Sequence, residues 1–174
     1  MGKVFFSGSI KESNIIQIDR SQPLTPNFIG NGWTIWRGPA NGNGLRGKDD
    51  QDERSLALTK LDLTKVQFET TLKKNENCVG GKERHNRLRK MGYIRLDIKI
   101  RQTLFENETL IPESWKDNIN GYCRYIFFDG TFLRNPDGQR CVPYMCWRNG
   151  EWILSDRWID MDFGVGDPSA ILAI

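Results

Sequence analysis

Three turn-forming dipeptides stand close together in the C-terminal third of the chain, at 129–130, 137–138 and 149–150. Asp-Gly and Asn-Gly pairs supply the positive φ angles that tight hairpin turns need. Three such pairs within 22 residues, separated by strand-like runs, predict an antiparallel β-meander over 120–163. This feature restricts the fold most strongly, because successive hairpins place neighbouring strands in one sheet.

The same region is rich in large rings. Ten of the 19 aromatic residues fall between Tyr122 and Phe163. Large rings on a pleated surface bury much apolar area. We therefore expect the meander to supply the core.

The middle of the chain, 78–118, is predicted to be largely helical. One helix is expected over Lys82–Met91, ending at Gly92, which suits the left-handed position after a helix. Residues 93–101 fit both an alternating strand and a helix face. We predict a short strand to Leu96 and a helix from an Asp97 N-cap to Asn107.

The remaining segments complete one domain spanning 1–174. Strands are predicted within 1–37, in the apolar runs at 4–6 and 15–18, followed by a glycine-rich and acidic loop over 38–54 and a strand near 64–72. The apolar tail Ser169–Ile174 is expected to pack on the body. The fold class is α+β, with central helices packed against a C-terminal antiparallel meander.

Composition excludes several classes of protein. The chain has 38% hydrophobic and 27% charged residues and a net charge of +3, and it contains neither an apolar run of roughly 18 residues nor a secretion signal. Four cysteines without a Cys-x-x-Cys pair, together with a single histidine, argue against a disulfide scaffold or a zinc site. We expect a soluble cytoplasmic protein with no membrane partner, metal or cofactor.

A basic run provides the first candidate site. Residues 82–101 contain eight Lys or Arg and two acids. Cations around a helix can lie against phosphates, and a nearby ring can stack on a base. The candidate nucleic-acid-binding residues are Arg84, Arg87, Arg89, Lys90 and Tyr93. The alternative for the same run is a solvated helix face.

An aspartate-rich segment provides the second candidate site. Asp156, Asp160, Asp162 and Asp167 lie near Trp147, Trp152 and Trp158. Paired carboxylates can act as acid and base in hydrolysis, and indoles can line a sugar-binding groove. The alternative is that the indoles form the sheet core while the aspartates cap turns.

Four segments resemble a family of small uncharacterised proteins from uncultivated bacteria: Phe28–Pro39, Asp50–Ser55, Ile111–Lys116 and Phe128–Thr131. The resemblance implies a coherent folded unit and assigns no functional residue. A second, shorter resemblance links Lys3–Ile10 to the opening strand of nucleoside deoxyribosyltransferases. The doubly wound sheet that it implies disagrees with the meander.

The sequence favours a non-enzymatic binding or interaction module, because no motif forms a convincing catalytic set. The alternative is a nucleic-acid-binding protein that uses 82–101. A third interpretation is a small carboxylate-dependent hydrolase acting on a sugar or nucleotide. The expected partner is a protein or a nucleic acid.

Overall fold

The computed structural model describes residues 14–24, 29–36 and 51–174. The predicted strand at 4–6 and almost all of the 38–54 loop lie outside these ranges. The strands are β1 (Ile15–Gln17), β2 (Thr34–Ile35), β3 (Lys60–Asp62), β4 (Val66–Glu69), β5 (Cys78–Gly80), β6 (Ile94–Arg95), β7 (Ile126–Phe127), β8 (Leu133–Arg134), β9 (Arg140–Arg148), β10 (Glu151–Trp158), β11 (Asp162–Gly164) and β12 (Ser169–Leu172). The α-helices are α2 (Glu53–Leu56), α3 (Gly81–Met91) and α4 (Ile98–Glu106), and short 3-10 turns cover Leu63–Lys65, Glu108–Leu110 and Glu113–Lys116.

Within the described residues, eight strands form one mixed sheet in which antiparallel pairs dominate. Its order is β2-β8-β9-β7-β12-β4, with β10 paired to β9 and β6 paired to β12. Two further strand pairs, β1 with β3 and β11 with β5, lie outside this sheet. The α+β class is therefore confirmed.

The β9–β10 hairpin is the longest element of the sheet. Its turn is Asn149-Gly150, and both residues have positive φ, 55° and 86°, as a two-residue hairpin turn requires. The turn at 135–139 connects β8 to β9, and Gly138 there has φ 82°. Both hairpins agree with the turn chemistry in the sequence.

The third turn differs from a simple meander. β7 pairs with β9 rather than with β8, so both short strands lie along one long partner. Gly130 shows the reason. A Cβ built at this residue would lie 2.2 Å from the main-chain oxygen of Arg95, so the chain passes close under β6 there instead of forming an exposed hairpin.

The helices begin and end as the sequence predicts. Gly92 has φ 78° and ends α3 in the left-handed conformation. The Asp97 side chain accepts hydrogen bonds from the main-chain N–H groups of Lys99 and Ile100, which caps α4. The region expected to be helical also contains strands, β5 and β6.

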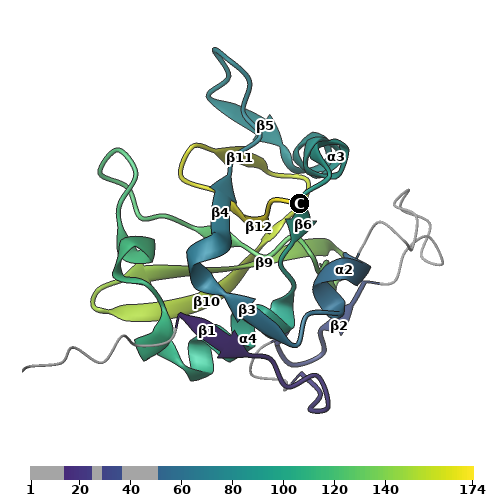
Figure 1. Ribbon diagram of the computed structural model, residues 1–174. Coiled ribbons are helices and arrows are strands. Elements are labelled where there is room, and N and C mark those ends of the chain that lie inside the picture. The colour runs from purple at the N-terminus through teal and green to yellow at the C-terminus, as the bar shows by residue number, and fades with distance from the viewer. Residues whose placement is uncertain (1–13, 25–28, 37–50) are drawn as a thin grey trace, which may run out of the picture.

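The two faces of the sheet bury different helices. On one face, α4 contributes Ile100 and Leu104 to a cluster with Met145 of β9. On the other face, Val142 packs with Phe127 and Phe163, and the Arg84 guanidinium of α3 lies over the last two rings. Figure 1 shows α3 and α4 on opposite sides of β9 and β10. The aromatic sheet is thus the centre of the core.

The C-terminal segment belongs to the sheet. β12 pairs with β4 and β6 in antiparallel fashion and with β7 in parallel. Ala170 and Ile171 are 0% and 1% exposed, so the expected packing of the tail is confirmed for Ser169–Leu172, whereas Ala173 and Ile174 are exposed. Across 14–24, 29–36 and 51–174, no helix has the length and hydrophobicity of a membrane span.

Candidate ligand-binding pocket

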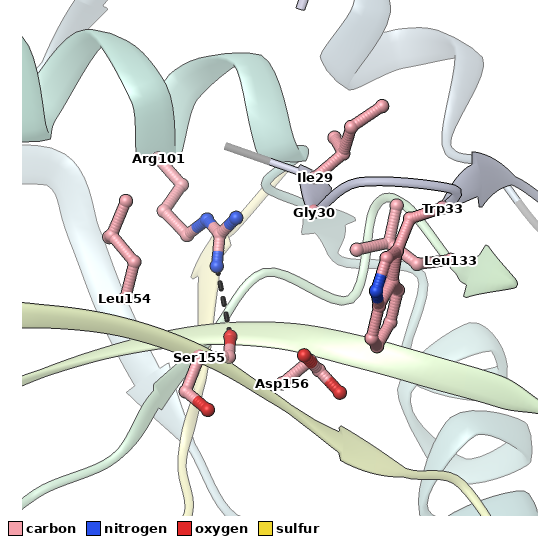
Figure 2. A pocket seen from close by; sticks show the side chains of 8 residues that line it. All are labelled: Ile29, Gly30, Trp33, Arg101, Leu133, Leu154, Ser155 and Asp156. Atoms are coloured by element: carbon pink, nitrogen blue, oxygen red, sulfur yellow. Dashed lines mark hydrogen bonds between the residues drawn. The ribbon is translucent and has the colours of Figure 1, made fainter. Parts of the chain in front are cut away.

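A small cavity opens between α4, β10, β8 and the turn at 30–33. Its volume is about 200 Å³. Its apolar lining consists of Ile29, Trp33, Leu133 and Leu154, and its polar lining consists of Arg101, Ser155 and Asp156. Figure 2 shows the Arg101 guanidinium and the Trp33 indole on opposite sides, with Asp156 between them. The cavity therefore presents a ring, a cation and an anion to one small volume.

Arg101 enters the cavity from α4 and is 2% exposed. Its Nη1 donates to the main-chain oxygens of Tyr144 at 3.1 Å and Ser155 at 2.9 Å, which fixes the guanidinium over β9 and β10. Burial lowers the pKa of Arg101 to about 10, and the negative charge of Asp156 opposes this effect. The guanidinium remains charged at neutral pH.

Asp156 projects from β10, where it stands opposite Pro143 of β9. Burial raises the pKa of this carboxyl group, while a hydrogen bond from Cys141 and the charge of Arg101 act in the opposite direction. The pKa of the Cys141 thiol is raised to about 12, first by burial and then by the neighbouring Asp156. Asp156 thus brings a carboxylate to the cavity, close to the Cys141 thiol.

The Trp33 indole owes its position to a glycine turn. Its main-chain N–H donates to the Gly30 oxygen at 3.2 Å, and Gly30 and Gly32 have φ of 86° and 77°. A Cβ at Gly30 would lie 2.4 Å from ring atom Cδ1 of Trp33. Only glycine leaves room for the indole against the turn, so the local sequence Gly-Asn-Gly-Trp builds this wall.

A larger cavity of about 390 Å³ lies beside the opposite edge of α4. Its lining includes Asp19 and Glu106, whose carboxylates accept hydrogen bonds from Ser21 and Gln102. Its lining contains no aromatic residue, so it lacks the combination of indole, guanidinium and carboxylate found in the smaller cavity.

The basic residues expected to face nucleic acid are not gathered on one surface. Arg84 is 1% exposed and paired with Asp129. Arg87 is held by Glu76 and Glu83. Arg89 and Lys90 are exposed and Tyr93 is half-buried. Within the described residues, the predicted set therefore divides between core, ion pairs and surface.

The rest of the basic run is also largely internal. Arg95, Lys99 and Arg101 are 4%, 8% and 2% exposed. Arg95 contacts Asp52, and its Nη1 lies 3.0 Å from Nδ1 of His85. The single histidine is buried in this network, away from the cavity. Acids that lie far away in the sequence compensate these cations, which a linear count of charges does not reveal.

The aspartate cluster is dispersed in the same way. Asp160 is exposed and paired with Lys82, Asp162 is exposed on β11, and Asp167 pairs with Arg157. Of these four acids, Asp156 alone lines the cavity. The Trp152 ring is 4% exposed and belongs to the core, whereas Trp158 is 47% exposed.

The pocket residues Trp33, Leu133 and Arg101 were not singled out together by sequence reasoning, because they come from distant segments. One local pattern could have indicated that Arg101 is buried. It lies three residues after Ile98, and residues with this spacing share a face of a helix. Asp156 belonged to the predicted acidic cluster. Among the described residues, no group of three His, Cys, Asp or Glu side chains is arranged to hold a metal ion.

Comparison of the chain with family models, curated proteins and solved structures gives no match. The resemblance to small bacterial proteins therefore stays a prediction.

Proposed function

We propose that this protein is a non-enzymatic binding module that takes a small polar ring compound into the cavity between α4 and β10. The observation that carries the proposal is the placement of Arg101 and Asp156 in a cavity faced by the Trp33 indole. Burying the Arg101 guanidinium costs free energy, and a titratable group whose pKa is shifted inside a cavity is a candidate functional residue. A few fixed polar groups against an apolar wall are typical of small-molecule sites.

The chemistry of the lining supports binding rather than catalysis. The Arg101 guanidinium is held by two carbonyl groups. The Cys141 thiol lies behind the lining and is fully buried, and with a pKa of about 12 it is protonated at neutral pH and is a poor nucleophile. General acid–base catalysis commonly uses two titratable groups at a working distance. Among the lining residues, Asp156 is the one carboxylate.

The proposed cellular location is the cytoplasm. All four cysteines are unpaired, and two of them, Cys141 and Cys146, are buried. Reduced cysteines that act as small buried groups are typical of a reducing compartment.

Fluorine NMR of protein labelled with 5-fluorotryptophan tests the binding function. The chain has six tryptophans, and the Trp33→Phe variant identifies the Trp33 resonance. We expect at least one compound from a panel of guanosine, adenosine, uridine, cytidine, glucose, arginine and tryptophan to shift that resonance saturably at millimolar concentration.

Two variants of β10 locate the binding event. Leu154→Phe fills the cavity and should abolish the shift, whereas Ile153→Phe, the neighbouring residue on the other face of the strand, should retain it. If no panel compound shifts the Trp33 resonance, or if Leu154→Phe leaves the shift intact, the proposed function is wrong.

A further inference from the structure

We infer that the ring bound in this cavity carries a lactam edge, a carbonyl group beside a ring N–H, as the base of guanosine does. This inference rests on the proposed function and names the class of its ligand. It follows from the order in which the cavity presents indole, carboxylate and guanidinium.

The indole wall selects a flat ligand. Trp33 is half-buried and lines the cavity, where its ring stands across from the Arg101 guanidinium (Figure 2). An aromatic ring can stack on any planar base, whichever hydrogen-bond donors and acceptors that base carries. A second indole, Trp158, lies two residues from Asp156 on the same face of β10 and is 47% exposed.

The carboxylate selects paired donors. An ionised Asp156 accepts hydrogen bonds at two oxygens and donates none. The edge of guanine offers N1–H and the 2-amino group side by side, which match these two oxygens. The edge of adenine places the lone pair of N1 there, which a carboxylate repels.

The guanidinium selects a neutral ligand with an electron-rich atom on its side of the cavity. Arg101 holds a positive charge across from Trp33. This charge disfavours cations such as arginine or an amine, although Asp156 alone would attract them. It favours a carbonyl oxygen, which in a lactam is adjacent to the N–H that faces Asp156.

The size of the cavity agrees with one base. Its volume of about 200 Å³ is below the roughly 300–1,000 Å³ of sites that enclose drug-sized ligands. A nucleoside would place its base inside and its ribose outside the opening.

The test compares guanosine with 1-methylguanosine and adenosine, with the Trp33 fluorine resonance as readout. Guanosine should bind saturably. Methylation of N1 removes one donor, and adenosine lacks the donor pair, so both should bind at least about tenfold more weakly, as expected for loss of a bidentate pair.

A pair of aspartate variants completes the experiment. Asp156→Asn keeps the shape of the side chain and should weaken guanosine binding at least about tenfold. Asp162→Asn, at an exposed aspartate on β11, should leave it unchanged. The other five fluorotryptophan resonances report that each variant is folded.

The outcomes separate the two proposals. Equal binding of guanosine and 1-methylguanosine, or guanosine binding that Asp156→Asn does not weaken, overturns the lactam inference while the binding function stands. Binding of glucose, arginine or adenosine in preference to guanosine does the same. If no compound in the panel reaches the Trp33 resonance, both proposals fall.

Discussion

Arg84 and Asp129 form an ion pair in which both side chains are 1% exposed. The second guanidinium nitrogen, Nη2, donates to Oδ2 of Asp129 at 3.0 Å and to the Ser169 hydroxyl oxygen at 2.6 Å. This pair connects α3 to the turn after β7 and to β12. The sequence suggests Arg84 as a surface residue for nucleic-acid recognition. In the structure it is buried and joins three segments of the fold through hydrogen bonds and an ion pair.

Replacement of Arg84 should therefore unfold the protein more easily. Arg84→Met leaves the Asp129 carboxylate buried without its cation, and we expect a loss of about 3–5 kcal/mol in the free energy of unfolding, measured by urea denaturation. Lys82→Ala on the same helix is the matched control, because Lys82 pairs with Asp160 where both side chains are more than half exposed. Surface pairs of this kind contribute little. Equal effects of the two substitutions would contradict the assignment.

Asp156 should reduce stability at neutral pH. Because burial raises its pKa in the folded state, the ionised form costs free energy above that pKa, and the cost disappears as the pH falls through it. Asp156→Asn should therefore raise Tm at neutral pH and have a smaller effect in acid, as followed by circular dichroism. An unchanged or lower Tm at neutral pH would contradict a destabilising effect of the ionised, half-buried Asp156. If Asp156→Asn raises Tm and also weakens ligand binding, Asp156 lowers stability in favour of function, as residues of binding sites commonly do.

Glu76 should contribute to the acid sensitivity of the protein. A hydrogen bond from Arg87 lowers the pKa of this carboxyl group from 4.5 to about 2. Because the folded-state pKa is depressed, the contribution is present above the unfolded value and is lost as the pH falls from about 4.5 towards 2. Glu76→Gln should make Tm decline less steeply in that range. Glu113→Gln, at a surface pair with Lys116, provides the comparison. If Tm depends on pH in the same way in both variants, Glu76 has no special part in the acid sensitivity.

Two glycines with different surroundings should respond differently to alanine. Gly130→Ala places a methyl group against the main chain of Arg95 and Leu96, and we expect a loss of at least about 3 kcal/mol or failure to fold. Gly150→Ala meets no atom within 4 Å but keeps φ at 86°, so the expected loss is about 1 kcal/mol. Urea denaturation and the yield of folded protein measure both. A smaller loss of stability for Gly130→Ala than for Gly150→Ala would contradict the close contact between Gly130 and the main chain of β6.

Local chemistry made several elements predictable from the sequence. Gly92 ends α3, Asp97 caps α4, and Asn149-Gly150 forms the β9–β10 turn. In each case the determining contact lies within a few residues. The Asp129-Gly130 turn contains the same dipeptide type, but a distant main chain decides its conformation.

The site was less predictable because its parts meet only in three dimensions. The cavity combines the turn at 30–33, Arg101 of α4 and Asp156 of β10. The interpretation of the basic run also depends on the fold, because Asp52 pairs with Arg95 and Asp129 pairs with Arg84. Charge counts along a chain do not contain these pairings, so they do not reveal that Arg84 and Arg95 are buried while Arg89 and Lys90 stay exposed.

The position of β12 has a consequence for the order of assembly. Ser169–Leu172 pairs with β4, β6 and β7, and its partner β4 lies about a hundred residues earlier (Ser169 opposite Glu69). During synthesis, those partners emerge from the ribosome well before the strand that joins them. Because closing such distant pairings is slow, the nascent chain must wait with open strand edges, and chaperone engagement would be most useful to this protein during that interval.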